Sequence, residues 1–269
     1  MPELPEVETV RRSLQPILGR RIERVHLWEP RLRRRVQLDF AQRVVGRRIE
    51  AVQRRGKYLL FDLADEVWML GHLGMSGALL LQPAGTARAP HDHVRFDLSG
   101  ALQLTFNDPR RFGLLRAGAV DELTELRNVG PDPLDAGFTE VQFLALTRQR
   151  KKPIKNLLMD QSLLAGVGNI YANEALFRAG IRPGRRAGRL TRAEAQALFA
   201  ALRSCLREAI ELGGSSISDY RDSAGRTGYF QLTLAVYDRT GQPCPRCAQP
   251  IRRKVHAGRS SFYCGRCQR

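Results

Sequence analysis

The sequence predicts an α+β protein that begins with an antiparallel β-sandwich and ends with a short cysteine-bearing strand pair. Short stretches of alternating apolar residues fill positions 21–118, which is typical of antiparallel strands in a sandwich or barrel. Apolar residues at helical spacing follow, and two CxxC pairs stand near the C-terminus. This order favours a β domain followed by a separate helical domain.

A helix is expected at residues 5–15, ahead of the first strand. Val7, Val10 and Leu14 recur at the spacing of one helical face. Pro5 suits the first helical turn, where a missing N–H group leaves no hydrogen bond unmade. The sandwich is therefore expected to carry a leading helix.

The clearest strand pair surrounds the dipeptide Ser99-Gly100. Residues 94–98 and 102–106 alternate apolar and polar side chains on either side of it, which predicts an antiparallel hairpin.

The later stretch NVGPDPLDAG has two prolines and two glycines and is interpreted as a linker. The expected domains are a β-sandwich at 1–127, a linker at 128–138, a helical domain at 139–230 and a cysteine-bearing tail at 231–269.

The segment 154–180 is expected to form a helix, a glycine-bearing turn and a second helix. Gly166 and Gly168 lie in the turn, and Asn169 is expected to cap the second helix. Free N–H groups at such a helix start bind anions, and Lys155 lies just upstream. An ordinary helical hairpin is the alternative, but the basic tail favours a phosphate-binding site.

Charge indicates a polyanionic partner. The chain carries 44 Lys and Arg residues against 27 Asp and Glu residues, a net charge of +17. Between Arg239 and Arg269 there are eight basic residues and no acidic one. This excess favours nucleic-acid binding over a surface that serves solubility alone. No apolar run suits a membrane span, and the acidic N-terminus is unlike an export signal, so we expect a cytoplasmic, nucleoid-associated protein.

The cysteines predict a metal site. Cys244 and Cys247 form one CxxC pair, and Cys264 and Cys267 form another after sixteen intervening residues. This spacing matches tetrahedral Zn²⁺ ligation by two hairpin knuckles, and a cytosolic chain argues against the alternative of two disulfides. Four thiolates leave no open coordination position, so the zinc is expected to be structural. Cys205 lies in an apolar helical stripe and is expected to be a core residue.

A series of motifs resembles the formamidopyrimidine-DNA glycosylases, a family of base-excision repair enzymes for oxidised purines. The motifs are PELPEVET at the start, QRRGKYLLF (53–61), HLGMSG (72–77), HDHV (91–94), DPRRFG (108–113), AGVGNIYANEALF (165–177), GYFQ (228–231) and the cysteine tail. Their order also matches, and the resemblance covers essentially the whole chain.

The resemblance implies a β-sandwich with a leading helix, a helix–two-turn–helix domain and a zinc finger, with DNA in the cleft between. It implies a bifunctional DNA glycosylase and AP lyase that removes 8-oxoguanine and formamidopyrimidines and cuts the strand by β,δ-elimination. One structural Zn²⁺ ion, damaged double-stranded DNA as partner, a monomeric chain and no membrane contact are expected.

Pro2 is the expected nucleophile once Met1 is removed. A terminal amine has a pKa near 8 and a lysine near 10.4, so the terminal amine is neutral far more often at pH 7. A neutral amine can attack C1′ of the deoxyribose and displace the base. A secondary amine leaves an iminium ion that cannot lose an N–H proton and so stays an electron sink. If Met1 remains, this nitrogen is an amide and the chain is inert.

Three further residues complete the expected catalytic set. Glu3 is expected to protonate the sugar ring oxygen, although Pro2 and Glu3 could also be a simple helix lead-in. By resemblance, Lys57 contacts phosphate and aids β-elimination. Arg259, between the zinc knuckles, is expected to clamp phosphate and aid δ-elimination.

The expected DNA contacts fall into two groups. By resemblance, Met75, Arg110 and Phe112 fill the void left by the extruded nucleotide, although Met and Phe also serve ordinary packing. The side chains expected to contact phosphates are Asn169, Lys155, Arg150 and His91. The polar, glycine-rich segment 213–231 resembles a lid over the extruded base.

Two other functions compete with this prediction. Endonuclease VIII shares the architecture but removes oxidised pyrimidines, and Leu4 with the void-filling set favours the purine enzyme. A zinc protein that binds DNA or RNA without activity would explain the charge and the cysteines. It would not explain the Pro2-Glu3 pair.

Overall fold

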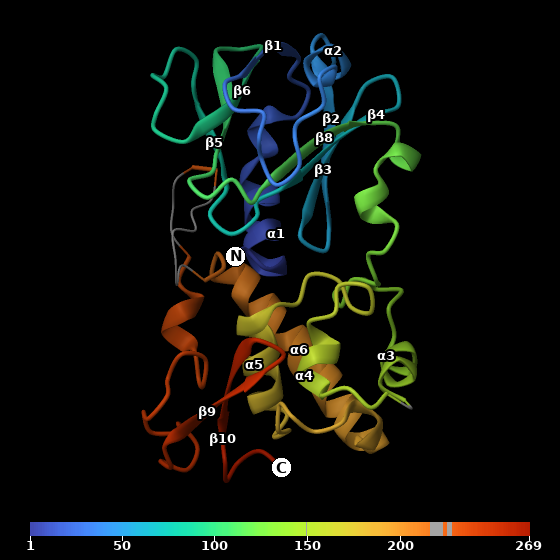
Figure 1. The fold of residues 1–269 in the computed structure, drawn as a ribbon, viewed down its shortest axis with the longest axis vertical. Helices are drawn as coiled ribbons and strands as arrows, with labels where there is room; N and C mark the ends of the chain where they lie inside the picture. Colours follow the sequence, from blue (N-terminus) through green and yellow to red (C-terminus); the bar gives the residue numbers. More distant parts are fainter. Residues whose placement is uncertain (149, 216–222, 225–227) are drawn as a thin grey trace. The chain divides into compact units, whose positions relative to one another are not determined.

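Two four-stranded antiparallel sheets make up the N-terminal part of the chain in the computed structural model (Figure 1). One sheet has the strand order β1-β6-β7-β5 and the other β2-β3-β4-β8. The strands are β1 (Ile22–Leu27), β2 (Ile49–Arg55), β3 (Tyr58–Leu63), β4 (Val67–His72), β5 (Ala78–Pro83), β6 (Asp92–Leu98), β7 (Leu102–Asn107) and β8 (Leu114–Gly118). The predicted α+β class and antiparallel sheet domain are confirmed.

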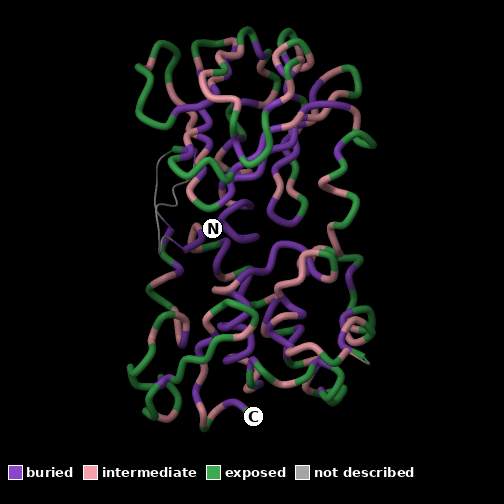
Figure 2. The backbone as a smooth tube through the Cα atoms, viewed as in Figure 1, coloured by how far each residue is buried: buried purple, intermediate pink, exposed green. Residues whose placement is uncertain are grey.

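One apolar core lies between the two sheets. It combines Phe61 of β3 with Phe96 and Phe106 of β6 and β7, and all three are fully buried. Figure 2 shows that buried residues recur along the strands of both sheets. The predicted hairpin is present, with Leu98 paired to Leu102, because alternate residues of β6 point into this core.

The leading helix is present as α1 (Leu4–Ser13). Val7 and Val10 bury its inner face in the sandwich core. A short helix, α2 (Phe40–Val44), covers the same core with a buried Phe40. The apolar spacing of the sequence therefore identified the correct face of α1.

The second part of the chain is helical and ends in a hairpin. Its helices are α3 (Glu140–Thr147), α4 (Ile154–Leu158), α5 (Asn169–Arg178) and α6 (Arg192–Glu211), and its strands are β9 (Ile251–His256) and β10 (Arg259–Cys264). The Phe143 and Phe199 rings stack with centroids 5.1 Å apart and join α3 to α6. Cys205 is fully buried in α6, as expected. Among the described residues, no helix is long and apolar enough to cross a membrane.

The chain divides into two compact units, each considered by itself below. The first unit comprises residues 1–127 and 212–231, and the second comprises 128–211 and 232–269. The structure describes residues 1–148, 150–215, 223–224 and 228–269, so most of the expected lid, 216–222 and 225–227, lies outside the described residues.

The segment 212–231 groups with the sandwich, whereas the sequence-based boundaries assign it to the helical domain. The Ser223 hydroxyl lies 2.7 Å from the Ser13 hydroxyl, and the Ser223 carbonyl accepts a hydrogen bond from the Leu81 N–H at 2.8 Å. These long-range bonds have no local sequence signal, because they join positions that are far apart along the chain.

Candidate active site and nucleic-acid interface

The start of α1 is buried and held by one carboxylate. Pro2 is buried, and the Glu3 and Glu6 side chains are 3% and 2% exposed. The Glu6 carboxylate accepts hydrogen bonds from the N–H groups of Glu3 and Ser215, both at 2.8 Å. The Glu3 N–H belongs to the peptide that joins Pro2 to Glu3. Glu6 therefore fixes the plane of that peptide, next to Pro2 at the start of α1.

Burial favours a neutral amine at the N-terminus. It lowers the pKa of the Met1 amine below its ordinary value, whereas the charges of Glu3 and Glu6 oppose this shift and those of Lys57 and Arg110 add to it. The lowered pKa increases the fraction of neutral amine at pH 7. The neutral form is the one that can act as a nucleophile.

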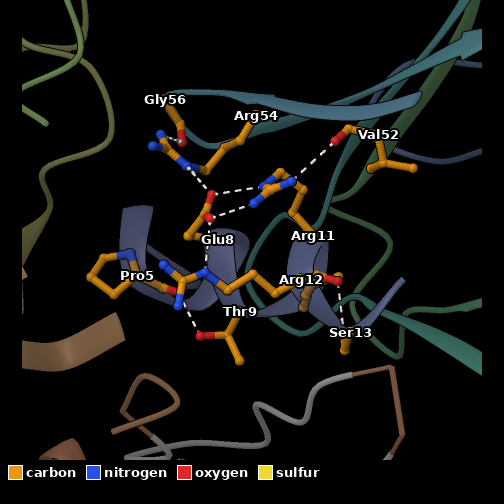
Figure 3. Close-up of polar contacts among 10 residues, drawn as sticks. Pro5, Glu8, Thr9, Arg11, Arg12, Ser13, Val52, Arg54 and Gly56 are labelled. Atoms are coloured by element: carbon orange, nitrogen blue, oxygen red, sulfur yellow. Dashed lines mark hydrogen bonds and ion pairs between the residues drawn. The ribbon is translucent and has the colours of Figure 1, made fainter. Parts of the chain in front are cut away.

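Lys57 lies in a tight turn that is tied to α1. The β2–β3 hairpin turns at Gly56 and Lys57, and Gly56 has a φ of 58°, which a glycine adopts without strain. The Arg54 guanidinium donates to the Glu8 carboxylate at 3.1 Å and to the Gly56 carbonyl at 3.2 Å (Figure 3). The Glu8–Arg54 pair therefore sets the position of Lys57, which is 7% exposed, relative to the start of α1.

Glu8 is ionised over the whole physiological range. Burial by itself would raise the pKa of this carboxyl, but the hydrogen bonds and charges of Arg11, Arg54 and Arg12 outweigh it and lower the pKa to about 2. Figure 3 shows the three guanidinium groups around the carboxylate. Glu8 serves as a charged anchor, and not as an acid or base at neutral pH.

His72, at the end of β4, is a neutral hydrogen-bond donor beside Lys57. It pairs with Tyr58, the residue that follows Lys57. Burial lowers the pKa of His72 to about 4, with smaller effects of Arg33 and Lys57. Its Nδ1 accepts the Gly74 N–H at 2.9 Å, so the neutral ring carries its proton on Nε2. Sequence analysis did not single out His72, although it opens the quoted HLGMSG motif.

The pKa of His72 predicts a pH dependence of stability. Its native pKa of about 4 lies below the unfolded value of roughly 6.5, so folding favours the neutral ring. This contribution is complete above pH about 6.5 and is lost as the pH falls towards 4. Between these limits, the free energy of unfolding of the wild type should fall by up to about 3 kcal/mol more than that of His72→Gln. Denaturant titrations at several pH values measure this, and parallel curves for the two proteins would exclude it.

Asp108 joins the loops that carry Met75, Arg110 and Phe112, the residues expected to fill the void. This fully buried carboxylate accepts hydrogen bonds from the Ser76 hydroxyl at 2.7 Å and the Gly113 N–H at 2.8 Å. Its own main-chain N–H donates to the His91 carbonyl at 3.0 Å. Gly74 has a φ of 64°, and a Cβ there would collide with the main chain of the 108–113 loop. The hydrogen bonds of Asp108 and the close approach that Gly74 allows therefore bring the HLGMSG, HDHV and DPRRFG motifs together.

Three side chains project from these joined loops. Met75 and Phe112 are 40% and 45% exposed, which is unusual for large apolar residues. The Arg110 guanidinium lies over the Phe112 ring, 4.9 Å from its centroid. His91 is exposed on the neighbouring loop with a φ of 69°. The structure thus collects all four residues on one edge of the first unit, available to a ligand.

The second unit brings the four tail cysteines together. The Sγ atoms of Cys244, Cys247, Cys264 and Cys267 all lie within 4.8 Å of one another, with Cys244–Cys267 at 3.9 Å and Cys247–Cys264 at 3.5 Å. Tetrahedral zinc with Zn–S bonds of about 2.3 Å needs sulfurs about 3.8 Å apart. The geometry fits one structural zinc ion, and the prediction is confirmed.

Arg259 is presented by the hairpin that the cysteines close. It is exposed at the first position of β10, opposite His256, after the two-residue turn Ala257-Gly258. Both turn residues have positive φ, 47° and 73°, which gives the turn the twist of the flanking strands. A guanidinium on such a fixed turn loses little entropy on binding phosphate.

The turn before α5 is built as expected, with one correction. Gly166 has a φ of 83°, and the cap of α5 is Gly168 and not Asn169, which is its first helical residue. Asn169 is half-buried. The prediction that Asn169 caps this helix was therefore wrong, because Asn169 already has helical backbone.

Of two further expected phosphate contacts, Lys155 is buried and Arg150 is partly accessible. Lys155 is 1% exposed, and its ammonium donates to the Ser260 carbonyl at 2.6 Å and the Ser261 hydroxyl at 2.9 Å. It holds β10 from inside the unit. Arg150 is half-buried, and its Nε donates to the Leu146 carbonyl at 2.9 Å.

Comparisons with known proteins agree over the full length. Three family profiles match, described as formamidopyrimidine-DNA glycosylase N-terminal domain at 1–115, its H2TH domain at 129–221 and the zinc finger found in FPG and IleRS at 241–269. The chain is 48% identical to formamidopyrimidine-DNA glycosylase from Rhodospirillum rubrum and 46% identical to that from Ruegeria pomeroyi, each over 100% of both chains.

Solved structures agree with these relatives. The MutM (Fpg) protein of Thermus thermophilus superimposes with a TM-score of 0.89 at 46% identity, over 99% of this chain and 98% of the other. Lactococcus lactis Fpg in complex with abasic-site DNA gives 0.90 at 36% identity, over 99% of both chains. MutM in complex with DNA containing carbocyclic 8-oxo-G gives 0.90 at 37% identity, over 99% of both chains.

Proposed function

The chain belongs to the formamidopyrimidine-DNA glycosylase family, and we propose that it excises oxidised purines, such as 8-oxoguanine and formamidopyrimidines, from duplex DNA and then cuts the strand as an AP lyase. One observation carries this proposal more than any other. The Pro2–Glu3 peptide is buried and fixed by Glu6, in surroundings that lower the pKa of a terminal amine.

The proposed reaction begins with the Pro2 amine after removal of Met1. The nitrogen bonds to C1′ of the damaged nucleoside, the glycosidic bond breaks, its electron pair leaves with the base, and the nitrogen gives its own proton to the Glu3 carboxylate. Glu3 protonates the sugar ring oxygen, so the ring opens and an iminium ion forms. Loss of a proton from C2′ then sends electrons to the iminium as the 3′-phosphate departs, and a second elimination releases the 5′-phosphate.

Donor side chains of both units are proposed to hold the phosphates around the lesion. Lys57 and the donor Nε2 of His72 are proposed to bind the phosphates that flank the lesion. Arg259 is proposed to grip phosphate and to assist δ-elimination, and Asn169 to bind phosphate at the start of α5. Lys155 is buried under β10, so we propose that it supports the hairpin and does not contact phosphate directly. Arg150 and His91 remain proposed phosphate contacts.

Met75, Arg110 and Phe112 are proposed to fill the vacancy when the target nucleotide leaves the stack. Extrusion costs a few kcal/mol of stacking and pairing, which apolar contact and an arginine can offset. Exposed Met and Phe side chains on loops fixed by Asp108 suit this role.

We further propose that the chain acts as a monomer in the cytoplasm, at the nucleoid.

Substrate choice tests the proposal against the related pyrimidine enzyme. Purified protein should release 8-oxoguanine from a duplex opposite cytosine at least about tenfold faster than thymine glycol from a matched duplex, a difference of about 1.4 kcal/mol in transition-state binding. Faster release of thymine glycol would assign the chain to oxidised pyrimidines. Salt-sensitive binding without any cleavage of either duplex would make it a binding protein.

A further inference from the structure

We propose that Asn173 is a positioning residue that sets both Asn169 and Arg259 for phosphate binding. This inference rests on the proposed function, because it takes those two residues as phosphate contacts. Asn173 lies in α5, is fully buried, and uses both ends of its amide. It has no access to a ligand itself, so any effect on DNA binding must pass through its partners.

One end of the amide holds the start of α5. Asn173 Nδ2 donates to the Asn169 carbonyl at 2.6 Å and lies 3.4 Å from Asn169 Oδ1. Because Asn169 Oδ1 is drawn towards Asn173, the planar Asn169 amide directs its NH₂ group the other way. An anion needs a donor at that position, and a flipped amide would present an oxygen. Asn173 therefore selects the orientation of Asn169 that binds phosphate.

The other end of the amide holds the zinc hairpin. Asn173 Oδ1 accepts a hydrogen bond from the Phe262 N–H at 2.9 Å. Phe262 lies three residues after Arg259 on β10, and the intervening Ser260 carbonyl is held by Lys155. Two buried side chains thus fix β10 against α4 and α5. The Arg259 turn keeps a set distance from Asn169 because both depend on one residue.

The two substitutions at Asn173 remove different sets of contacts. In Asn173→Asp, the carboxylate still accepts from the Phe262 N–H but has no donor for Asn169. In Asn173→Ser, the hydroxyl can donate to the carbonyl four residues earlier, as helical serines do, but it has no second proton for Asn169 Oδ1 and is too short to reach the Phe262 N–H. Asn173→Asp should therefore release Asn169 alone, and Asn173→Ser should release both Asn169 and the hairpin.

The effect is measured as the affinity for a duplex that contains an uncleavable abasic-site analogue. The Asn173 variants are tested alone and in combination with Asn169→Ala or Arg259→Ala. Each alanine variant alone should weaken binding about tenfold, as expected for a hydrogen bond to a charged group. Asn173→Asp should match Asn169→Ala, and the double variant should lose less than about threefold more. Asn173→Ser should show the same overlap with both Asn169→Ala and Arg259→Ala. Zinc content and melting temperature report separately on folding.

The outcomes separate positioning from mere support of the fold. The proposal would be overturned if adding Asn169→Ala to Asn173→Asp lowered DNA affinity by a further full tenfold. It would also be overturned if both Asn173 variants bound DNA as tightly as the wild type. If Asn169→Ala and Arg259→Ala themselves bind as tightly as the wild type, the assigned phosphate contacts are wrong and the positioning role falls with them. If they weaken binding but the Asn173 variants do not, only the positioning role is wrong.

Discussion

Pro2→Gly should slow strand cleavage at an abasic site by about 100-fold while DNA affinity changes by less than threefold. Glycine still offers a terminal amine, but a primary amine forms an iminium ion that keeps an N–H proton. Loss of that proton gives a neutral imine. The neutral imine is a poorer electron sink than the iminium of proline, so elimination slows. Single-turnover cleavage and equilibrium binding on the same duplex measure the two quantities.

Pro16→Gly is the matched control for this change. Pro16 is exposed in the short helical turn after α1, so the same substitution there should alter neither cleavage nor binding. Equal losses of cleavage and affinity in Pro2→Gly would mean that Pro2 serves the fold of the α1 start and not the chemistry.

Cys247→Ser should lose the zinc ion and lower DNA affinity by at least about tenfold, with a much larger fall if the hairpin unfolds. The apolar core of the hairpin is small, and two of its six buried members, Cys244 and Cys264, are themselves metal ligands. Structural zinc contributes roughly 10–16 kcal/mol of apparent binding free energy in small zinc fingers, more than such a core can replace. Without the metal, the turn that presents Arg259 loses its fixed position.

Cys205→Ala supplies the control for the zinc prediction. It removes a thiol that is fully buried in α6, away from the four ligands. Metal analysis should still find one zinc ion per chain, and affinity should stay within about twofold of the wild type. A zinc-free Cys247→Ser protein with normal affinity for DNA would contradict the structural role of the metal.

Features with a local signal were predictable from the sequence. The hairpin at Ser99-Gly100 and the zinc ligands follow from alternation and spacing within a few residues. The leading helix follows from the apolar face of Val7 and Val10. In each case the residues that decide the structure are neighbours along the chain.

Features that depend on distant pairs were not predictable. Glu6 accepts a hydrogen bond from the Ser215 N–H, 209 positions away, and this bond ties the start of α1 to the segment 212–231. Lys155 was expected to contact phosphate, but Ser260 and Ser261 of β10 accept hydrogen bonds from its ammonium inside the unit. A sequence alone does not state which buried acceptor a lysine will meet.

Borohydride reduction during turnover is the most direct test of Pro2 as the nucleophile. With a duplex that contains 8-oxoguanine, reduction should trap a covalent protein–DNA adduct, and peptide mapping should place the sugar on the nitrogen of Pro2 in chains that have lost Met1. Rapid cleavage by such chains with no adduct, or with an adduct on Lys57, would contradict the proposed mechanism.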